Sequence, residues 1–151
     1  MGAALFYHLT QGPVDQTAPT LLARALKQGW RVAVRGTERQ KLEWLDEKLW
    51  LGPEEEFLPH GLEGGPQDAL QPVLLCEGPP ANDPQCLMCI DGADAAPEEV
   101  ARYERVWILF DGHDPAAVER ARGQWRALTG AGCAAQYWSE ESGRWEKKAE
   151  A

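Results

Sequence analysis

The chain has 151 residues, of which 44% are hydrophobic and 26% are charged, and its formal net charge is −9. This length fits one domain, and the composition is that of a globular protein, which excludes wholesale disorder and the fibrous classes. The excess of acidic over basic residues disfavours a broad phosphate-binding surface, so we expect little direct nucleic-acid binding outside a local basic patch.

The lengths of the apolar runs and the N-terminal residues indicate the cellular location of the protein. They are only as long as strands, as in VWILF at 106–110, so no membrane span is predicted. The N-terminal MGAALFYHL has no basic segment before its apolar stretch, so we infer no secretory signal and expect a cytoplasmic protein.

The first elements are a strand at 4–9 and, after a turn-rich connection, a helix whose apolar residues recur at helical spacing. Thr17 is predicted to be the N-cap of this helix, with Pro19 in its first turn and Gly29 as its end. A second strand is predicted at 31–36 from its β-branched residues.

Thr37 is expected to cap a second amphipathic helix that runs to about Trp50, where Gly52 and Pro53 prevent its continuation. The opening order is therefore strand, helix, strand, helix. This order builds a parallel sheet covered by helices.

The second half continues the alternation. Asp114 or Asp111 is predicted to cap its long helix. The expected elements are strands at 72–78 and 85–92, a short helix in PEEVARYER, a buried strand in RVWILFDG, a helix at 114–129 and a last strand in GAGCAAQYW. We predict one three-layer α/β domain over 1–138, with a mostly parallel sheet and helices on both faces, and a polar C-terminal tail at 139–151.

Cys86 and Cys89 form a CxxC sequence, but no second pair lies at metal-ligand spacing. Because the pair falls inside the apolar run CLMCI, we interpret these residues as buried strand cysteines. A metal or redox pair is the alternative.

Nucleotide motifs are missing from the turns that would carry them. LTQGPVD and VRGTERQ contain neither GxGxxG nor GxxxxGK[ST], so the predicted fold is Rossmann-like without a nucleotide fingerprint. We expect no cofactor.

An enzymatic alternative places Asp111 and His113 at the end of a central strand, joined by His60. It requires the three side chains to converge on one pocket. The other reading is structural: His60 is a hydrogen-bonded residue beside Pro59, and FDGHD is a helix cap with a tight turn. The histidines have no recognisable metal-ligand spacing, so no metal site is predicted.

The sequence contains seven tryptophans, too many for one modest core, so some are expected at protein-binding surfaces.

The segment LDEKLWLGPEEEFLPHGL at 45–62 carries a resemblance to a known family. Together with FDG at 110–112 and a final helix that bears an aromatic followed by a basic residue, it resembles the chi subunit of bacterial DNA polymerase III. The matching positions are Leu45, Asp46, Glu47, Leu49, Trp50, Phe57, Pro59, His60 and Leu62.

The resemblance implies a non-catalytic adaptor of the clamp-loader complex. Its implied partners are the psi subunit and the acidic, Phe-terminated C-terminal tail of the single-stranded DNA-binding protein. Trp50 and Phe57, with Pro59 and His60, would form the psi side, which some family members also use for a helicase.

The tail side maps to Arg120, Arg122, Trp125 and Arg126 on the last helix. Arg122 and Arg126 are one helical turn apart, so both can meet an acidic peptide, although such a pair also forms salt bridges on solvated faces. A basic position of the family falls near Val118, so two alternatives are open: Arg120 substitutes for it from a neighbouring turn, or the tail binds more weakly.

Overall fold

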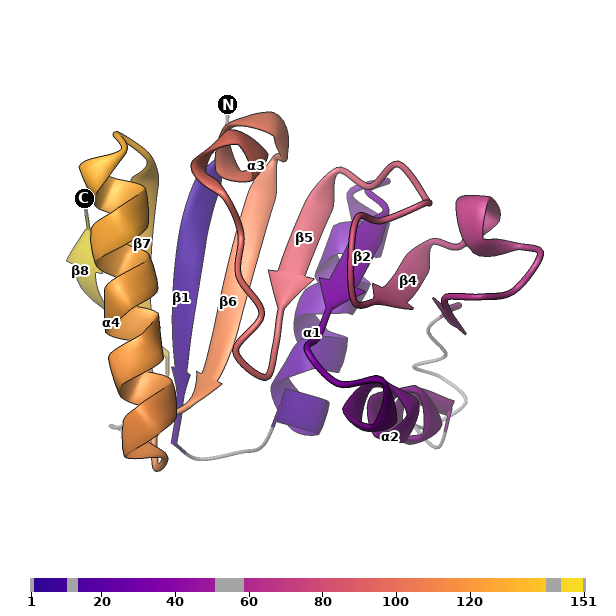
Figure 1. Cartoon of the computed structure of the whole chain (residues 1–151), viewed down its shortest axis with the longest axis horizontal. Helices are drawn as coiled ribbons and strands as arrows, with labels where there is room; N and C mark the ends of the chain where they lie inside the picture. Colours follow the sequence, from indigo (N-terminus) through magenta and orange to yellow (C-terminus); the bar gives the residue numbers. More distant parts are fainter. Residues whose placement is uncertain (1, 11–13, 51–58, 141–144, 151) are drawn as a thin grey trace.

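The computed structural model describes residues 2–10, 14–50, 59–140 and 145–150, which form one sheet with helices on both faces (Figure 1). The strands are β1 (Ala3–Leu9), β2 (Val32–Arg35), β3 (Gly61–Leu62), β4 (Val73–Cys76), β5 (Cys86–Cys89), β6 (Arg105–Asp111), β7 (Ala134–Ser139) and β8 (Glu146–Glu150). The helices are α1 (Val14–Lys27), α2 (Arg39–Trp50), α3 (Pro97–Arg102), α4 (Pro115–Gly130) and the short 3-10 helix η2 (Asp68–Leu70).

Across the sheet the strands of the described residues follow the order β3-β4-β2-β5-β6-β1-β7-β8. The pairs from β3 to β7 are parallel, and β8 is antiparallel to β7. β1 lies between β6 and β7, with Ala3 opposite Arg105 on one side and Ala134 on the other.

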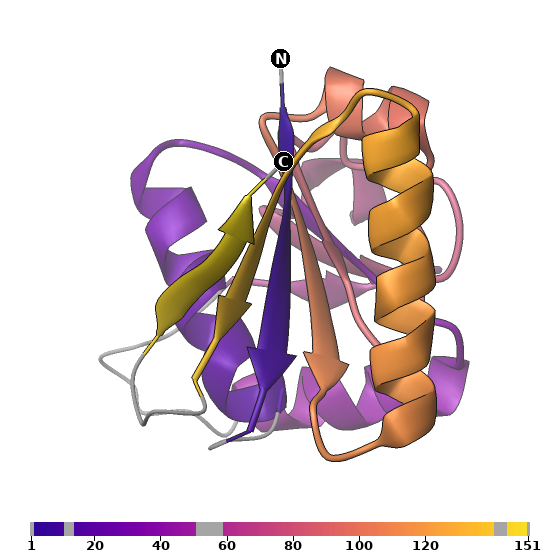
Figure 2. The same cartoon turned by 90° about the vertical axis from the view of Figure 1, so that its left-hand side faces the viewer.

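The central strand β6 shows why the protein has three layers. Every residue of its VWILF run is buried, and alternate side chains enter different cores. Trp107 and Leu109 pack with α1 and α2, whereas Ile108 and Phe110 pack with α3 and α4. Figure 2 shows the sheet edge-on between α1 and α4. The predicted three-layer α/β fold is therefore confirmed.

The start of α1 differs from the prediction. The described part of the helix begins at Val14, so Thr17 and Pro19 lie inside it and Thr17 is not its N-cap. Val14 packs against the core on this face, so the longer helix buries additional apolar surface. The predicted end is confirmed, since Gly29 has a φ of 82° and the Trp30 backbone N–H donates to the Ala25 carbonyl at 3.1 Å.

Thr37 does not cap α2. Its hydroxyl donates to the carbonyl of Asp91 at 2.8 Å, and the Glu38 carbonyl accepts the first helical bond, from Leu42. A contact with a distant loop has replaced the local cap. In α4 the prediction holds, with Asp114 as the cap, because its carboxylate accepts from the Ala116 backbone N–H at 3.0 Å.

Part of the segment predicted as a polar tail joins the sheet. Residues 146–150 form β8 along β7. Trp145, just before β8, packs its ring 4.9 Å from that of Tyr7, which ties this segment to the core on the α1 face.

Candidate protein-binding surfaces

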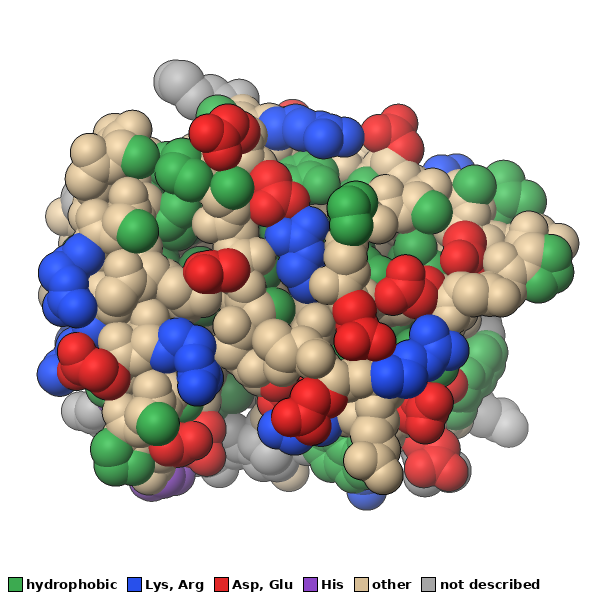
Figure 3. Space-filling model, in the orientation of Figure 1, with side chains coloured by type: hydrophobic (Ala, Val, Ile, Leu, Met, Phe, Trp, Pro, Cys, Tyr) green, Lys and Arg blue, Asp and Glu red, His purple; other side chains and the backbone are tan. Residues whose placement is uncertain are grey.

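The solvent side of α4 carries a cationic stripe formed by Arg122 and Arg126. Their side chains are 64% and 68% exposed, and a guanidinium nitrogen of each lies 3.8 Å from a carboxylate oxygen of Glu119. These three residues lie on one stripe because they are three, four and seven positions apart. Figure 3 shows Lys and Arg side chains gathered at the outer edge of α4. Exposed pairs of this length contribute little free energy, so an incoming carboxylate can compete with Glu119.

Trp125 lies beside the stripe and turns toward the sheet. Its ring centroid is 5.4 Å from that of Phe6 and 6.2 Å from that of Tyr137. The hydroxyl of Tyr137 is 2.8 Å from Nδ1 of His8, which fixes the Tyr137 ring. Trp125 remains half-buried, so the cationic stripe borders an aromatic surface between α4 and β7.

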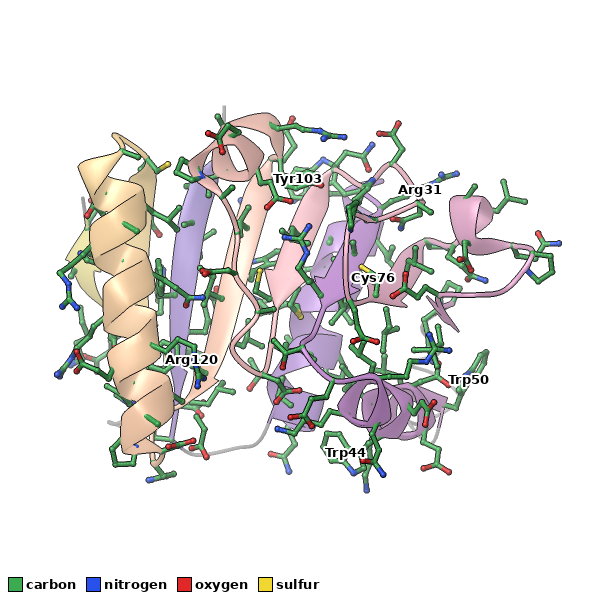
Figure 4. All side chains as sticks on the ribbon, in the orientation of Figure 1. Arg31, Trp44, Trp50, Cys76, Tyr103 and Arg120 are labelled. Atoms are coloured by element: carbon green, nitrogen blue, oxygen red, sulfur yellow. The ribbon has the colours of Figure 1, made fainter. Side chains whose placement is uncertain are left out.

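Arg120 belongs to the other flank of α4. A helical step of about 100° per residue places it about 200° from Arg122. Its guanidinium group packs near Gly92, where an added Cβ would lie 2.8 Å from Nη1 of Arg120. Figure 4 shows the side chain extending from α4 toward the β5–α3 connection. The predicted grouping of Arg120 with Arg122 and Arg126 is therefore not what the structure shows.

A groove of about 1080 Å³ lies where β1, β5 and β6 end. The adjacent strands β6 and β1 lead to α4 and α1 on opposite faces, so this is the switch point where α/β proteins often bind ligands. Its charged lining comprises Glu38, Lys41, Asp91, Asp111, Asp114 and Arg120, together with His113. Carboxylates outnumber cations here, and burial raises the pKa of Asp91 against the opposing effect of Lys41. The groove is unsuited to a phosphate, in agreement with the missing phosphate loops.

The enzymatic alternative requires Asp111, His113 and His60 to converge. Asp111 and His113 both line the groove, and the Asp111 carboxylate accepts from the His113 backbone N–H at 2.9 Å. His60 does not line it, because its fully buried side chain packs under α2 with Nε2 3.2 Å from an Asp46 carboxylate oxygen. The structure does not assemble this site.

The end of α2 presents Trp50, which is 52% exposed and points outward in Figure 4. The His60 ring supports it, with centroids 4.3 Å apart and an interplanar angle of 40°. Pro59 is half-buried beside them, and Phe57 lies outside the described residues. Since His60 is buried, its contribution to this surface is to hold Trp50 in place, while Trp50 makes any outward contact.

Cys86 and Cys89 are three residues apart on β5 and so face opposite sides of the sheet, each in a different core. Burial raises the pKa of Cys86 to about 11 and that of Cys89 to about 12. The prediction of buried strand cysteines is confirmed, and the alternative interpretation as a metal-binding or redox pair is wrong. Within the described part of the chain, no three His, Cys, Asp or Glu side chains come together as a metal site.

Sequence reasoning missed Trp44 and Leu70, which are 42% and 65% exposed. The signal for Trp44 was present, because the inward spacing of Leu42 and Leu45 leaves it on the outer side of α2. Lys48 lies 5.7 Å from the centroid of the Trp44 ring. No local pattern indicates that Leu70 is exposed.

Exposed tryptophan and arginine side chains such as Trp50, Arg122 and Arg126 are of the types that dominate protein–protein interfaces, so these surfaces favour docking on other proteins. The family model of the DNA polymerase III chi subunit, HolC, matches residues 1–136, and the chain therefore belongs to this family. Membership confirms the family indicated by residues 45–62 and 110–112, and it gives the protein an accessory role in DNA replication, in association with DNA polymerase III. None of the curated proteins matches the chain. Among the described helices, none is long and apolar enough to cross a membrane.

Proposed function

We propose that this protein is a cytoplasmic adaptor that holds the acidic C-terminal tail of the single-stranded DNA-binding protein and connects it, through psi, to the clamp-loader complex. The observation that carries the proposal is the cationic stripe of Arg122 and Arg126 beside Trp125, on a member of the chi family. On a protein of net charge −9, an acidic peptide needs a local cationic surface of this kind.

The chemistry of the stripe suits a peptide that ends in Phe. Two guanidinium groups provide fork-shaped donors for carboxylates, and the edge of the Trp125–Tyr137 cluster provides an apolar neighbour for the terminal ring. Val118, near which the family has a basic residue, adds no charge. Arg120 faces the acidic groove, so the proposed tail site consists of Arg122, Trp125 and Arg126.

Calorimetry with the tail peptide tests this assignment. We expect micromolar affinity, about −8 kcal/mol or weaker, that falls as salt is added because the cations are exposed. Arg126→Glu should weaken binding by more than about tenfold, since it replaces attraction with repulsion. Arg120→Glu is the matched control with the same charge change on the other flank. Equal losses in both variants, or none in Arg126→Glu, would remove the site assignment.

The psi side is proposed at Trp50 and Pro59, supported by His60, and Phe57 is included from the family resemblance. An exposed aromatic anchor on a rigid support has the character of an interface hot spot. The helicase partner is proposed for the same surface.

Two exposed tryptophans of α2 allow a matched test of the psi side. Trp50→Ala should abolish co-elution with psi in size-exclusion chromatography, whereas Trp44→Ala should leave it intact. Retention of psi by Trp50→Ala would place the psi site elsewhere.

A further inference from the structure

A second, smaller cavity of about 490 Å³, here called the basic pocket, lies between the C-terminal end of α1 and the amino end of β6. Its charged and aromatic lining consists of Arg24, Lys27, Arg105, Tyr7, Trp30 and Trp107. Figure 2 shows the end of α1 at the same edge of the sheet as the starts of β1 and β6. The pocket is thus at the opposite edge from the acidic groove.

The cations of this pocket have no carboxylate partner in the part of the chain that the structure describes. No carboxylate lines it, and within the described residues Arg24, Lys27 and Arg105 form no ion pair. They are not needed to cap α1, because backbone N–H groups of residues 28–30 already donate to the carbonyls of residues 24–26. Three neighbouring cations that lack an ion pair within the described ranges form a local positive potential that favours an anion, although the net charge is −9.

The pocket also has a flat apolar wall. The Arg105 guanidinium carbon lies 5.5 Å from the centroid of the Trp30 ring, which is within the range of a cation–π contact. Burial raises the pKa of Tyr7, while Arg105 and Arg24 oppose this shift, so both cations lie near its hydroxyl. That hydroxyl stays protonated at neutral pH as a hydrogen-bond donor.

We propose that the basic pocket binds a nucleotide unit, with its phosphate held by Arg24, Lys27 and Arg105 and its base against the aromatic wall of Trp30 and Tyr7. Phosphate oxygens match guanidinium forks, and bases of any sequence stack on aromatic rings. The pocket lies over the internal strands β1 and β6, which offer no free edge to a peptide backbone. A compact anion with a flat ring fits this wall better than an extended acidic peptide.

The source of the nucleotide is a free mononucleotide or the backbone of single-stranded DNA. Because the three cations hold one phosphate, the predicted slope of log K against log salt on a single strand is about −0.7, which is about a threefold loss of affinity between 50 and 200 mM. The net charge of −9 disfavours a broad phosphate-binding surface, so we expect such binding to be local.

Fluorescence anisotropy with a short labelled oligothymidylate tests the proposal on the full chain. Lys27→Glu and Lys48→Glu are matched variants, because each replaces an exposed lysine in the last turn of a helix and changes the net charge from −9 to −11. We expect wild type and Lys48→Glu to bind alike, and Lys27→Glu and Arg24→Glu to bind about tenfold more weakly. Arg126→Glu should bind DNA normally, which separates this pocket from the tail site.

Competition identifies the source of the ligand. If dTMP displaces the labelled oligothymidylate, the proposal is supported and a free nucleotide is a sufficient ligand. If the oligothymidylate binds but dTMP does not displace it, the proposal is supported and the ligand is the single strand. Displacement by the acidic tail peptide would overturn it in favour of a peptide site. Absence of binding, or equal affinities for Lys27→Glu and Lys48→Glu, would overturn it as well.

Discussion

The ion pair between Arg35 on β2 and Glu99 on α3 allows a quantitative test of the packing. Arg35 Nη1 donates to Glu99 Oε1 at 3.0 Å and Nη2 to Oε2 at 2.7 Å, so the pair is bidentate. The side chains are only 12% and 25% exposed. Glu99 also accepts from the Ala96 backbone N–H at 3.0 Å. The substitution Glu99→Gln keeps the shape and an acceptor for Ala96 but removes the charge.

The expected cost follows from burial. Removing one partner of a fully buried pair costs about 3–5 kcal/mol, and exposed pairs are worth about 0–1 kcal/mol. Arg35 would keep its bond to the Asp94 carbonyl, and its buried Nε already lacks a partner within the described residues. We therefore expect Glu99→Gln to lower the free energy of unfolding by about 2–3 kcal/mol at pH 7.

Urea unfolding measures this loss, with Glu43→Gln as the control. The Arg39–Glu43 pair is 3.5 Å long and its side chains are 46% and 57% exposed, so its loss should cost less than about 0.5 kcal/mol. The pH dependence has a definite sign. Hydrogen bonding to Arg35 lowers the pKa of Glu99 below its ordinary 4.5, so the stabilisation is present above that value and is lost as pH falls through the lower folded pKa. Equal, small losses in both variants, or a difference unchanged by acid, would show that the Arg35–Glu99 pair does not stabilise the fold.

Two further predictions concern packing and thiol chemistry. Gly112→Ala should destabilise the protein by about 2 kcal/mol in thermal unfolding, because its Cβ would clash with the His8 ring and lie 2.8 Å from the Leu9 carbonyl. Gly123→Ala on α4, where a Cβ meets nothing within 4 Å, should instead stabilise it by about 0.5–1 kcal/mol, and a loss there would contradict the open space. At pH 8 a thiol reagent should modify only the half-buried Cys133 in the folded protein, since burial keeps the other three thiols protonated, and all four cysteines in urea. Rapid modification of a second cysteine without urea would show that a strand thiol is accessible.

Local signals predicted the fold well. The unbroken run of β6 indicated burial on both faces, and Asp114 was one of the two caps predicted for α4. The predicted caps failed where a tertiary contact prevailed over a local one. Thr37 has the right chemistry for a cap, but the Asp91 carbonyl, 54 residues away, takes its hydroxyl.

The candidate site was predictable only within single elements. The helical repeat of about 3.6 residues per turn places Arg122 beside Arg126, and it places Arg120 on another side of the helix. By contrast, the basic pocket combines Arg24 with Arg105 across two elements, so no sequence window contains it. The burial of His60 likewise depends on the distant Asp46 and on the packing of α2.

The antiparallel strand β8 closes one side of the sheet with the sequence EKKAE, in which four of five residues are charged. A parallel sheet that ended at β7 would leave a longer and less charged row of backbone groups open to another chain. The two lysines and two glutamates of β8 make that row costly to extend, and at the opposite border β3 is only two residues long. Among the described strands, both outer strands of the sheet are therefore poor templates for pairing with a strand of another chain.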